Sequence, residues 1–517
     1  MENKIVILLH ISYLKYVGHY LNMLSLRNKI ENNFYINNYS VLSILCIVTL
    51  ARIISLFFSP IELSVDEAQY WHWSRSLEWG YFTKPPIIAW IIAVSTSVFG
   101  QEEWAVRLFS PIIHFLISIF LWIASNYFFG SKSGRVAALI WIFTPIASLG
   151  SFIISTDTPL LLFWSLALIF LIKLIKTRTL SYSIAIGITL GLGLLSKYAA
   201  LYFLIFLVLW WLIYDRGIDL KIKSFILITL FALIISSGNL YWNYQNDFVT
   251  FNHTMSNADL KSVNFNYKNL FEFLSSQLLV FGPLLFLLYL YNIFQSFYLN
   301  NKLSLLAMLS FPIIFLIIIQ SFLKIANANW AVTAYIAATL ILSAFVVVNK
   351  KKYLRFIFTI GMFLNICISL FILGVTMTGS FKPLELKSNP LRKNLGFELH
   401  AQKIKKIVIA NSISSIIVEN RSDITRFNYY LNRFDNKLEN NIYLNSSTNV
   451  PGNFYEANFD FKKQNFDINN KILIVSQFKE DKIFKNLSNI NFIEKITEET
   501  IDGLKREYYL FIGTIVK

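Results

Sequence analysis

The chain has 517 residues, of which 55% are hydrophobic and only 15% are charged. This composition, with a mean hydropathy of +0.53, excludes a soluble globular protein, a disordered chain and a disulfide scaffold. The formal charge is +16, but Lys and Arg lie mainly in short loops and in an Asn- and Lys-rich C-terminal part. We therefore interpret these cations as signals of membrane topology rather than of nucleic-acid binding.

Apolar runs of about 20 residues recur between residues 41 and 378, and they predict an all-α polytopic membrane domain over this range. Residues 1–40 show no small-residue cleavage site, so we expect a cytoplasmic N-terminal extension rather than a signal peptide. About eleven windows are long enough to cross roughly 30 Å of hydrocarbon. The windows are 41–58, 104–128, 135–153, 158–175, 180–196, 199–214, 222–241, 271–295, 303–323, 330–349 and 354–376.

Positive charge in every second loop places those loops in the cytoplasm, by the positive-inside rule. With an odd number of spans, residues 379–517 then lie on the outer, periplasmic side. Their composition shifts to Asn, Lys, Asp and Glu around short β-type runs, which predicts a small soluble α/β domain. These runs are Lys406–Ala410, Lys471–Ser476 and Tyr508–Val516.

The first outer loop, residues 59–103, carries two adjacent acids, Asp66 and Glu67. Asp66, Tyr70 and Trp73 are spaced at i, i+4 and i+7, so a helix starting here would place a carboxylate at its N-terminus and aromatic rings along one face. An interfacial helix with aromatic-belt residues explains the same pattern equally well.

Further along the same loop, Ile87–Phe99 is apolar but too short to span, and it follows two prolines. We interpret it as an interfacial or re-entrant segment.

Ionisable residues also gather at the predicted outer ends of spans, against the charge bias. They are Lys84, Lys197, Lys324 and Asp157. A single interfacial lysine usually only extends its amine to the headgroup level. For the whole set, a shared anionic ligand is the more economical interpretation.

Cations at headgroup depth can hold a lipid-linked phosphate, while a neighbouring carboxylate can take a proton from an attacking hydroxyl. This combination describes sugar transfer from a polyprenyl phosphate, with the lipid phosphate as leaving group. Asp66 would be the general base for the acceptor. Aromatic side chains of Tyr70, Trp73 and Tyr81 would stack on sugar or isoprenoid.

The motifs around these residues resemble a known family. They are Asp66-Glu67-Ala68-Gln69-Tyr70-Trp71, Gly80-Tyr81-Phe82, Lys84-Pro85-Pro86, Glu103-Trp104-Ala105-Val106-Arg107-Leu108, Asp157-Thr158-Pro159-Leu160, Gly193-Leu194-Leu195-Ser196-Lys197-Tyr198, Trp242-Asn243 with Asn246-Asp247-Phe248, and Asn329-Trp330-Ala331 before Ala334-Tyr335. Together they resemble bacterial GT-C glycosyltransferases of the protein O-mannosyltransferase and aminoarabinose-transferase superfamily, over most of residues 41–400.

The resemblance implies a bundle of transmembrane helices with a large first outer loop and a soluble outer domain. By the family pattern, Asp66 is the catalytic acid of the loop, Lys84 lies near the lipid phosphate and Asp157 is a recurrent acid of the second outer loop. The full set of candidates is Asp66, Glu67 and Asp157 for catalysis, and Lys84, Lys197, Lys324 and Arg107 for the donor phosphate. Some members of this fold bind a divalent ion, which makes Asp66, Glu67 and Asp157 candidate ligands, although the sequence alone establishes no metal.

The sequence therefore predicts an inverting glycosyltransferase of a bacterial inner membrane that uses an undecaprenyl- or dolichyl-phosphate sugar. The acceptor is a lipid, a cell-envelope glycan or a protein. A nucleotide-sugar donor is disfavoured because no glycine-rich phosphate loop occurs. A transporter or lipid flippase and a non-catalytic membrane scaffold remain alternative hypotheses; a transporter predicts ionisable groups near the bilayer midplane and related halves.

Overall fold

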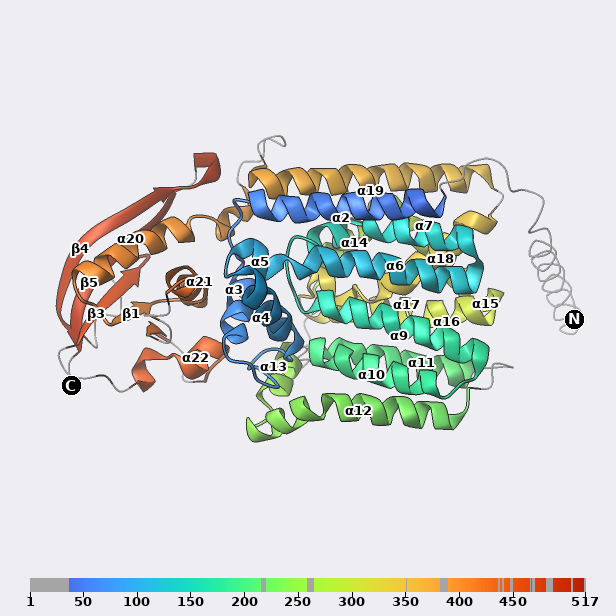
Figure 1. Ribbon diagram of the computed structural model, residues 1–517, viewed down its shortest axis with the longest axis horizontal. Coiled ribbons are helices and arrows are strands. Elements are labelled where there is room, and N and C mark those ends of the chain that lie inside the picture. Colours follow the sequence, from blue (N-terminus) through green and yellow to red (C-terminus); the bar gives the residue numbers. More distant parts are fainter. Residues whose placement is uncertain are drawn as a thin grey trace, which may run out of the picture.

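The computed structural model describes residues 37–515, apart from 215–219, 258–264, 350, 382–388, 436–437, 439–440, 447–449, 465, 467–469, 480–486 and 504. The predicted extension over residues 1–40 therefore lies almost entirely outside the described residues. The described chain forms three successive parts: a bundle of helices, a layer of short helices at one end of it, and a sheet with its own helices beyond that layer (Figure 1).

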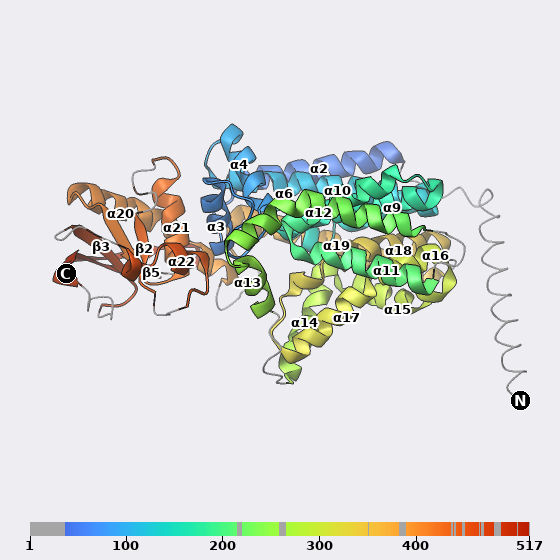
Figure 2. The same cartoon turned by 90° about the horizontal axis from the view of Figure 1, so that it is seen from below.

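The bundle consists of helices that run side by side (Figures 1 and 2). They are α2 (Asn38–Phe58), α6 (Phe109–Phe129), α7 (Ser131–Ile142), α8 (Pro145–Gly150), α9 (Asp157–Thr177), α10 (Ser181–Ser196), α11 (Leu201–Tyr214), α12 (Ile222–Gln245), α14 (Tyr267–Phe281), α15 (Pro283–Leu299), α16 (Asn301–Met308), α17 (Phe311–Leu323), α18 (Ala334–Val348) and α19 (Lys352–Thr378). Among the described residues, six helices are long and apolar enough to span a membrane, or seven if the pair α14 and α15, bent by 104°, counts as one span. The predicted count of eleven is thus not confirmed.

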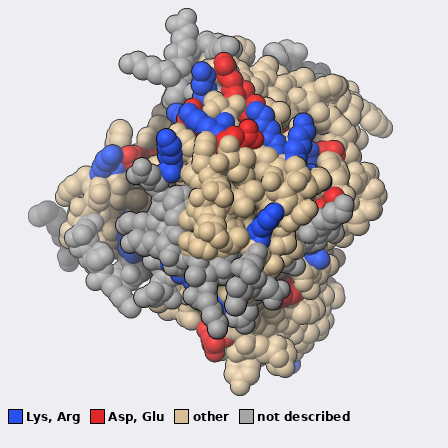
Figure 3. All heavy atoms as spheres, turned by 90° about the vertical axis from the view of Figure 1, so that its left-hand side faces the viewer, with Lys and Arg blue, Asp and Glu red and all other residues tan. Residues whose placement is uncertain are grey.

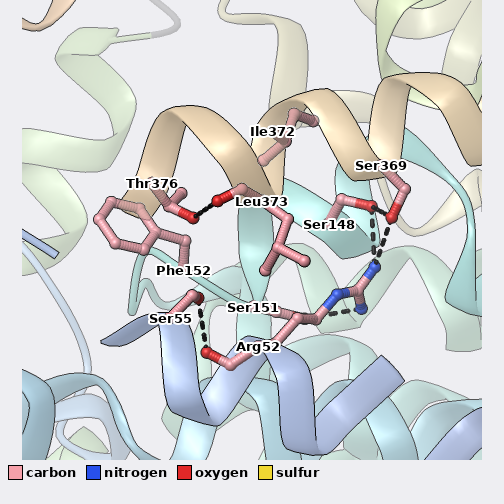
Figure 4. A pocket seen from close by; sticks show the side chains of 9 residues that line it. All are labelled: Arg52, Ser55, Ser148, Ser151, Phe152, Ser369, Ile372, Leu373 and Thr376. Carbon is pink, nitrogen blue, oxygen red and sulfur yellow. Dashed lines mark hydrogen bonds between the residues drawn. The ribbon is translucent and has the colours of Figure 1, made fainter. Parts of the chain in front are cut away.

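One cation lies inside the bundle, on the first of these spans. The Arg52 guanidinium of α2 is buried and donates to the hydroxyls of Ser148, Ser151 and Ser369 at 2.8, 3.1 and 3.3 Å (Figure 4). It also donates to the Ile142 carbonyl at 2.7 Å. A charge in an apolar environment needs such partners. Arg52 therefore ties α2 to α19, the last helix of the bundle, and to the end of α8.

The layer of short helices contains most of the first outer loop. It comprises α3 (Val65–Ser74), α4 (Ile87–Phe99), α5 (Glu103–Arg107) and α13 (Val249–Asn257). Helix α3 begins where it does because Ser64 and Glu67 form a capping box, in which each side chain accepts a hydrogen bond from the other residue's backbone N–H. Ile87–Phe99, predicted from its length not to span, forms α4 with those bounds.

The C-terminal part contains α20 (Phe397–Ala410), α21 (Arg421–Asn432), α22 (Phe454–Asn458) and a five-stranded sheet. The strands are β1 (Ser415–Val418), β2 (Ile442–Leu444), β3 (Lys471–Ser476), β4 (Leu487–Glu499) and β5 (Lys505–Ile515), in the order β2-β1-β3-β5-β4. Strands β2, β1 and β3 are parallel, whereas β5 is antiparallel to both β3 and β4. Acidic and basic side chains are interspersed on this end of the molecule (Figure 3).

Two of the three predicted β-type runs form strands, since Lys471–Ser476 is β3 and Tyr508–Val516 overlaps β5. The prediction for Lys406–Ala410 is wrong, because this run is the last turn and a half of α20. The helix buries Phe397, Ala401, Ile404 and Val408, which are spaced at i, i+4, i+7 and i+11. A five-residue window could not show that period.

The C-terminal part shares one hydrophobic core with the first outer loop. Buried side chains of α3 and α4 pack in the same cluster as those of α20, α21 and the sheet. Trp71 of α3 packs edge-on against Tyr429 of α21 with ring centroids 4.9 Å apart. Helix α21 is thereby fixed against the helix that carries Asp66.

Candidate active site

Asp66 lies at the start of α3 and forms an ion pair with a residue from the C-terminal part. Arg421, the first residue of α21, donates from Nη2 to Asp66 Oδ1 at 2.7 Å. The same guanidinium donates from Nε and Nη2 to Gln69 Oε1 at 3.0 and 2.8 Å. Gln69 is fully buried, one helical turn after Asp66. The candidate base is therefore held by a residue that lies 355 positions further along the sequence.

A second acid–base group forms where three helices of the bundle end near each other. Asp157, the first residue of α9, accepts from Lys197 Nζ at 2.7 Å and from Asn329 Nδ2. Lys197 is the residue that ends α10, and Asn329 lies in the short 3₁₀ helix η2 (Ala328–Ala331) before α18. Asp157 thus has both carboxylate oxygens occupied.

Lys84 connects the two groups electrostatically. Burial lowers the pKa of Lys84, and Lys197 and Arg421 lower it further, whereas Asp66 and Asp157 raise it. All four charges therefore lie close enough to act on one amine. The loop that carries Lys84 is closed by a hydrogen bond from the Tyr81 N–H to the Lys84 carbonyl at 3.0 Å.

The three aromatic candidates, Tyr70, Trp73 and Tyr81, are all buried. Burial and the negative charges of Asp66 and Asp157 raise the pKa of Tyr70 well above its ordinary value. Trp73 stacks on Tyr81 with ring centroids 4.7 Å apart and planes only 6° from parallel. The Tyr81 hydroxyl also donates to the Trp73 carbonyl, so these rings contact each other, and their role in stacking on sugar or lipid stays a prediction.

Glu67, the residue after Asp66, forms a separate pair with Arg107. Arg107 donates from Nε and Nη2 to the two Glu67 oxygens at 2.8 and 2.9 Å, and it also donates to the backbone carbonyls of Ile61 and Glu62. Both side chains are buried. This pair joins α3 to α5 and lies among backbone groups of the loop.

The remaining lysine candidate is Lys324. It ends α17, and its backbone N–H donates to Gln320. Asn329, five residues further along, supplies the contact with Asp157. The phosphate role of Lys324 stays a prediction.

Sequence reasoning missed Arg421 and Gln69. Asn420, Arg421 and Asp423 do form a recognisable helix start, because Asn420 accepts a hydrogen bond from the Asp423 N–H. Nothing in that local pattern points to residue 66. The contact depends on how the C-terminal part packs on the first outer loop.

The described residues do not fit a divalent-ion site. Among residues with a described placement, no group of three or more His, Cys, Asp or Glu could hold a metal. Both Glu67 oxygens accept from Arg107, and those of Asp157 accept from Lys197 and Asn329. Metal binding by these acids would require breaking those contacts.

Comparison with known proteins gives three consistent results. Residues 83–242 match the family model described as dolichyl-phosphate-mannose-protein mannosyltransferase. Lipid A galacturonosyltransferase RgtD of Rhizobium johnstonii is 29% identical over 431 residues, which cover 83% of this chain and 89% of that protein. The crystal structure of ArnT from Cupriavidus metallidurans bound to undecaprenyl phosphate superposes with a TM-score of 0.65 at 14% identity, over 93% of this chain and 99% of ArnT.

The apo structure of the same ArnT gives a TM-score of 0.64 at 13% identity, over 92% of this chain and 97% of ArnT. These structures show that the fold is shared. In sequence the chain is thus similar to glycosyltransferases, and six or seven candidate membrane spans lie among its described residues. Over residues 83–242 the chain is similar to the dolichyl-phosphate-mannose-protein mannosyltransferase family, the superfamily that its motifs resemble.

Proposed function

We propose that the chain transfers a sugar from a polyprenyl phosphate, of the undecaprenyl- or dolichyl-phosphate type, to an acceptor hydroxyl. The observation that carries this proposal is the position of Lys84, a partly buried amine on which the charges of Lys197, Asp66 and Asp157 all act. A cation beside two carboxylates, at the ends of membrane helices, suits an anionic lipid headgroup that must be held and then released.

In the proposed reaction the acceptor oxygen attacks the anomeric carbon from the side opposite the lipid phosphate. The new carbon–oxygen bond forms as the bond from that carbon to the phosphate oxygen breaks, and the electron pair leaves with the phosphate. Asp66 takes the hydroxyl proton. Lys84 stabilises the charge that grows on the phosphate, a contribution of about 3–4 kcal/mol for a well-placed donor. One displacement inverts the anomeric configuration.

Lys197 is the second phosphate-facing cation in this scheme. Its amine donates to Asp157, and the other Asp157 oxygen accepts a hydrogen bond from Asn329. Asp157 is then an acid that positions Lys197, rather than a second base. Glu67 and Arg107 are positioning residues as well, because their charges are already matched by each other.

A lipid is the proposed acceptor, because RgtD, the relative that covers most of the chain, is named for transfer to lipid A. The same name makes galacturonic acid the first sugar to test. We place the enzyme in a bacterial inner membrane with its active site on the periplasmic face, where the loop charges put the first outer loop and residues 379–517.

The test is sugar transfer by the purified full-length protein from a labelled polyprenyl-phosphate galacturonic acid, without any ion gradient. We expect Asp66→Asn and Lys84→Met each to lower kcat by about 10²–10³-fold. Lys173→Met is the matched control. It removes a lysine near the other end of α9, 16 residues from Asp157, or about 24 Å along the helix axis.

Full transfer by Asp66→Asn would refute the assignment of the base. Uptake of the lipid sugar into sealed vesicles with no transfer would instead support the transporter.

A further inference from the structure

We propose that Arg421 is a positioning residue through which the C-terminal part sets the orientation of the catalytic carboxylate. This inference rests on the proposed function, because it takes Asp66 as the base. It assigns the C-terminal part a place inside the active site, although that part lies outside the matched segment, residues 83–242.

The two carboxylate oxygens of Asp66 have different environments. Oδ1 accepts from Arg421 Nη2 at 2.7 Å, whereas Oδ2 has no partner among the described residues. The Asp66 side chain is 61% exposed, so Oδ2 can be reached from outside. A carboxylate held by one oxygen presents the other in a fixed direction, as proton abstraction from a bound hydroxyl requires.

The Arg421 guanidinium is itself held in place by Gln69. Nε and Nη2 of Arg421 both donate to Oε1 of Gln69, which is fully buried. The guanidinium plane is therefore set by a side chain that cannot move into solvent. Lysine could not reproduce this arrangement, because its amine is a point charge without the planar fork of arginine.

Helix α21 is held in place by contacts with two other parts of the chain. Arg426 donates to the Leu63 carbonyl at 3.0 Å, and the Leu63 N–H donates to the Tyr430 hydroxyl at 3.1 Å. The Asp423 carboxylate is buried and accepts from the Tyr508 hydroxyl of β5 at 2.8 Å. Helix α21 is thus bound both to Leu63, two residues before α3, and to the sheet, so the backbone of Arg421 is held in place.

An ordinary surface ion pair would explain the contact without any role in catalysis. Exposed pairs add little to stability, and Arg421 is 36% exposed. The two interpretations differ in what they predict: the ordinary pair leaves kcat unchanged, whereas the positioning residue changes kcat with little effect on stability.

The kinetic experiment compares Arg421→Gln with Arg433→Gln in the full-length enzyme. Arg433 is the matched control because it follows the same helix and pairs with Glu102 and Glu398 rather than Asp66. We expect Arg421→Gln to lower kcat by about 10- to 100-fold with the KM for the lipid donor changed less than about threefold. Arg421→Lys should recover part of the loss, and Asp66→Asn with Arg421→Gln should be no slower than Asp66→Asn alone.

Equal kcat values for Arg421→Gln and Arg433→Gln would overturn the inference, as would a double variant that multiplies the two losses.

A second experiment needs no activity. In protein with Cys46→Ala and Cys367→Ala, the thiol introduced by Asp66→Cys is alkylated at a rate that depends on nearby cations, since thiolate is the reactive form. Adding Arg421→Gln should slow alkylation several-fold, and adding Arg433→Gln should not. An unchanged rate would overturn the inference even if transfer is intact. If the wild-type enzyme transfers no polyprenyl-linked sugar, the proposed function fails, and the catalytic role of Arg421 fails with it.

Discussion

Glu67, the residue that follows the proposed base, forms a fully buried, two-point ion pair with Arg107. The two acids of the Asp66-Glu67 dipeptide therefore have opposite environments: Asp66 is 61% exposed and Glu67 only 1%. Adjacent residues on a helix point about 100° apart, so one carboxylate faces outward while the next faces the core. The same motif thus supplies one exposed and one buried carboxylate.

This difference predicts that Glu67→Gln acts on stability. The substitution leaves the buried Arg107 charge without its carboxylate, which typically costs about 3–5 kcal/mol. We expect a clear fall in the unfolding temperature of the detergent-solubilised protein, measured by intrinsic tryptophan fluorescence. Glu272→Gln is the control, because Glu272 pairs with Lys268 at 3.9 Å on an exposed helix face and should change little. A normally stable Glu67→Gln protein that has lost transfer would instead make Glu67 catalytic.

Gly187 gives a prediction about the packing that positions Lys197. A Cβ on Gly187 of α10 would lie 2.7 Å from the Ile228 carbonyl oxygen of α12, so Gly187→Ala must push the two helices apart. Overpacking of this kind costs about 1–3 kcal/mol. We expect lower thermal stability and lower transfer activity, because α10 ends at Lys197.

Gly374→Ala is the matched control for that substitution. Gly374 lies inside α19, and an added Cβ would meet no heavy atom within 4 Å. Alanine is favoured over glycine inside a helix by about 0.5–1 kcal/mol, so this variant should be as stable as the wild type or slightly more so. Equal losses in both variants would contradict the packing argument.

The lowered pKa of Lys84 predicts the alkaline limb of the activity profile. Burial shifts the pKa below the ordinary value of 10.5, so as pH rises Lys84 loses its proton, and its charge, earlier than an exposed lysine would. If the cation holds the donor phosphate, kcat should fall on the alkaline side below the ordinary lysine range. Arginine stays protonated throughout. Lys84→Arg should therefore move the alkaline limb to higher pH, whereas Lys173→Arg should not. If the alkaline limbs of Lys84→Arg and the wild type were identical, Lys84 would not be the cation that holds the donor phosphate.

The positions of the membrane helices could be predicted from the sequence, whereas their number could not. All four shorter apolar helices coincide with predicted apolar segments, but they have only 10–17 residues. Helix α18 shows the reason: every residue from Ala334 to Ala344 is buried. A helix surrounded by other helices is apolar for the same reason as one surrounded by lipid, so a hydropathy window cannot separate the two cases. The bend between α14 and α15 occurs at Gly282, whose φ of +100° favours glycine.

The sequence also indicated the acids and lysines of the candidate site, because charge at the end of an apolar span is unusual enough to be noticed. It could not indicate Gln69, which looks like any polar residue of an interfacial helix. Nor could it separate Asp66 from Glu67, since their roles depend on Arg107 and Arg421, which lie 40 and 355 residues away from their partners. Long-range contacts of this kind are set by tertiary packing.

The shared core predicts that the C-terminal part and the first outer loop unfold together. Tyr429 is fully buried, packs on Trp71 and donates to the Gln101 carbonyl at 2.7 Å. Tyr429→Ala should remove about 3–5 kcal/mol, as large-to-small aromatic substitutions in a core do. We expect proteolysis to cut both the C-terminal part and the first outer loop faster, over the same temperature range.

Phe492→Ala on β4 is the control for this prediction, because Phe492 is 51% exposed and should be replaced with little effect. If the C-terminal part were a separate domain, Tyr429→Ala would expose its own cleavage sites while the first outer loop stayed protected. That outcome would contradict the shared core. It would also mean that the C-terminal part, which carries Arg421, moves relative to the first outer loop, which carries Asp66. Arg421 could then not hold the Asp66 carboxylate in a fixed direction. The positioning role of Arg421 therefore requires that the two parts unfold together.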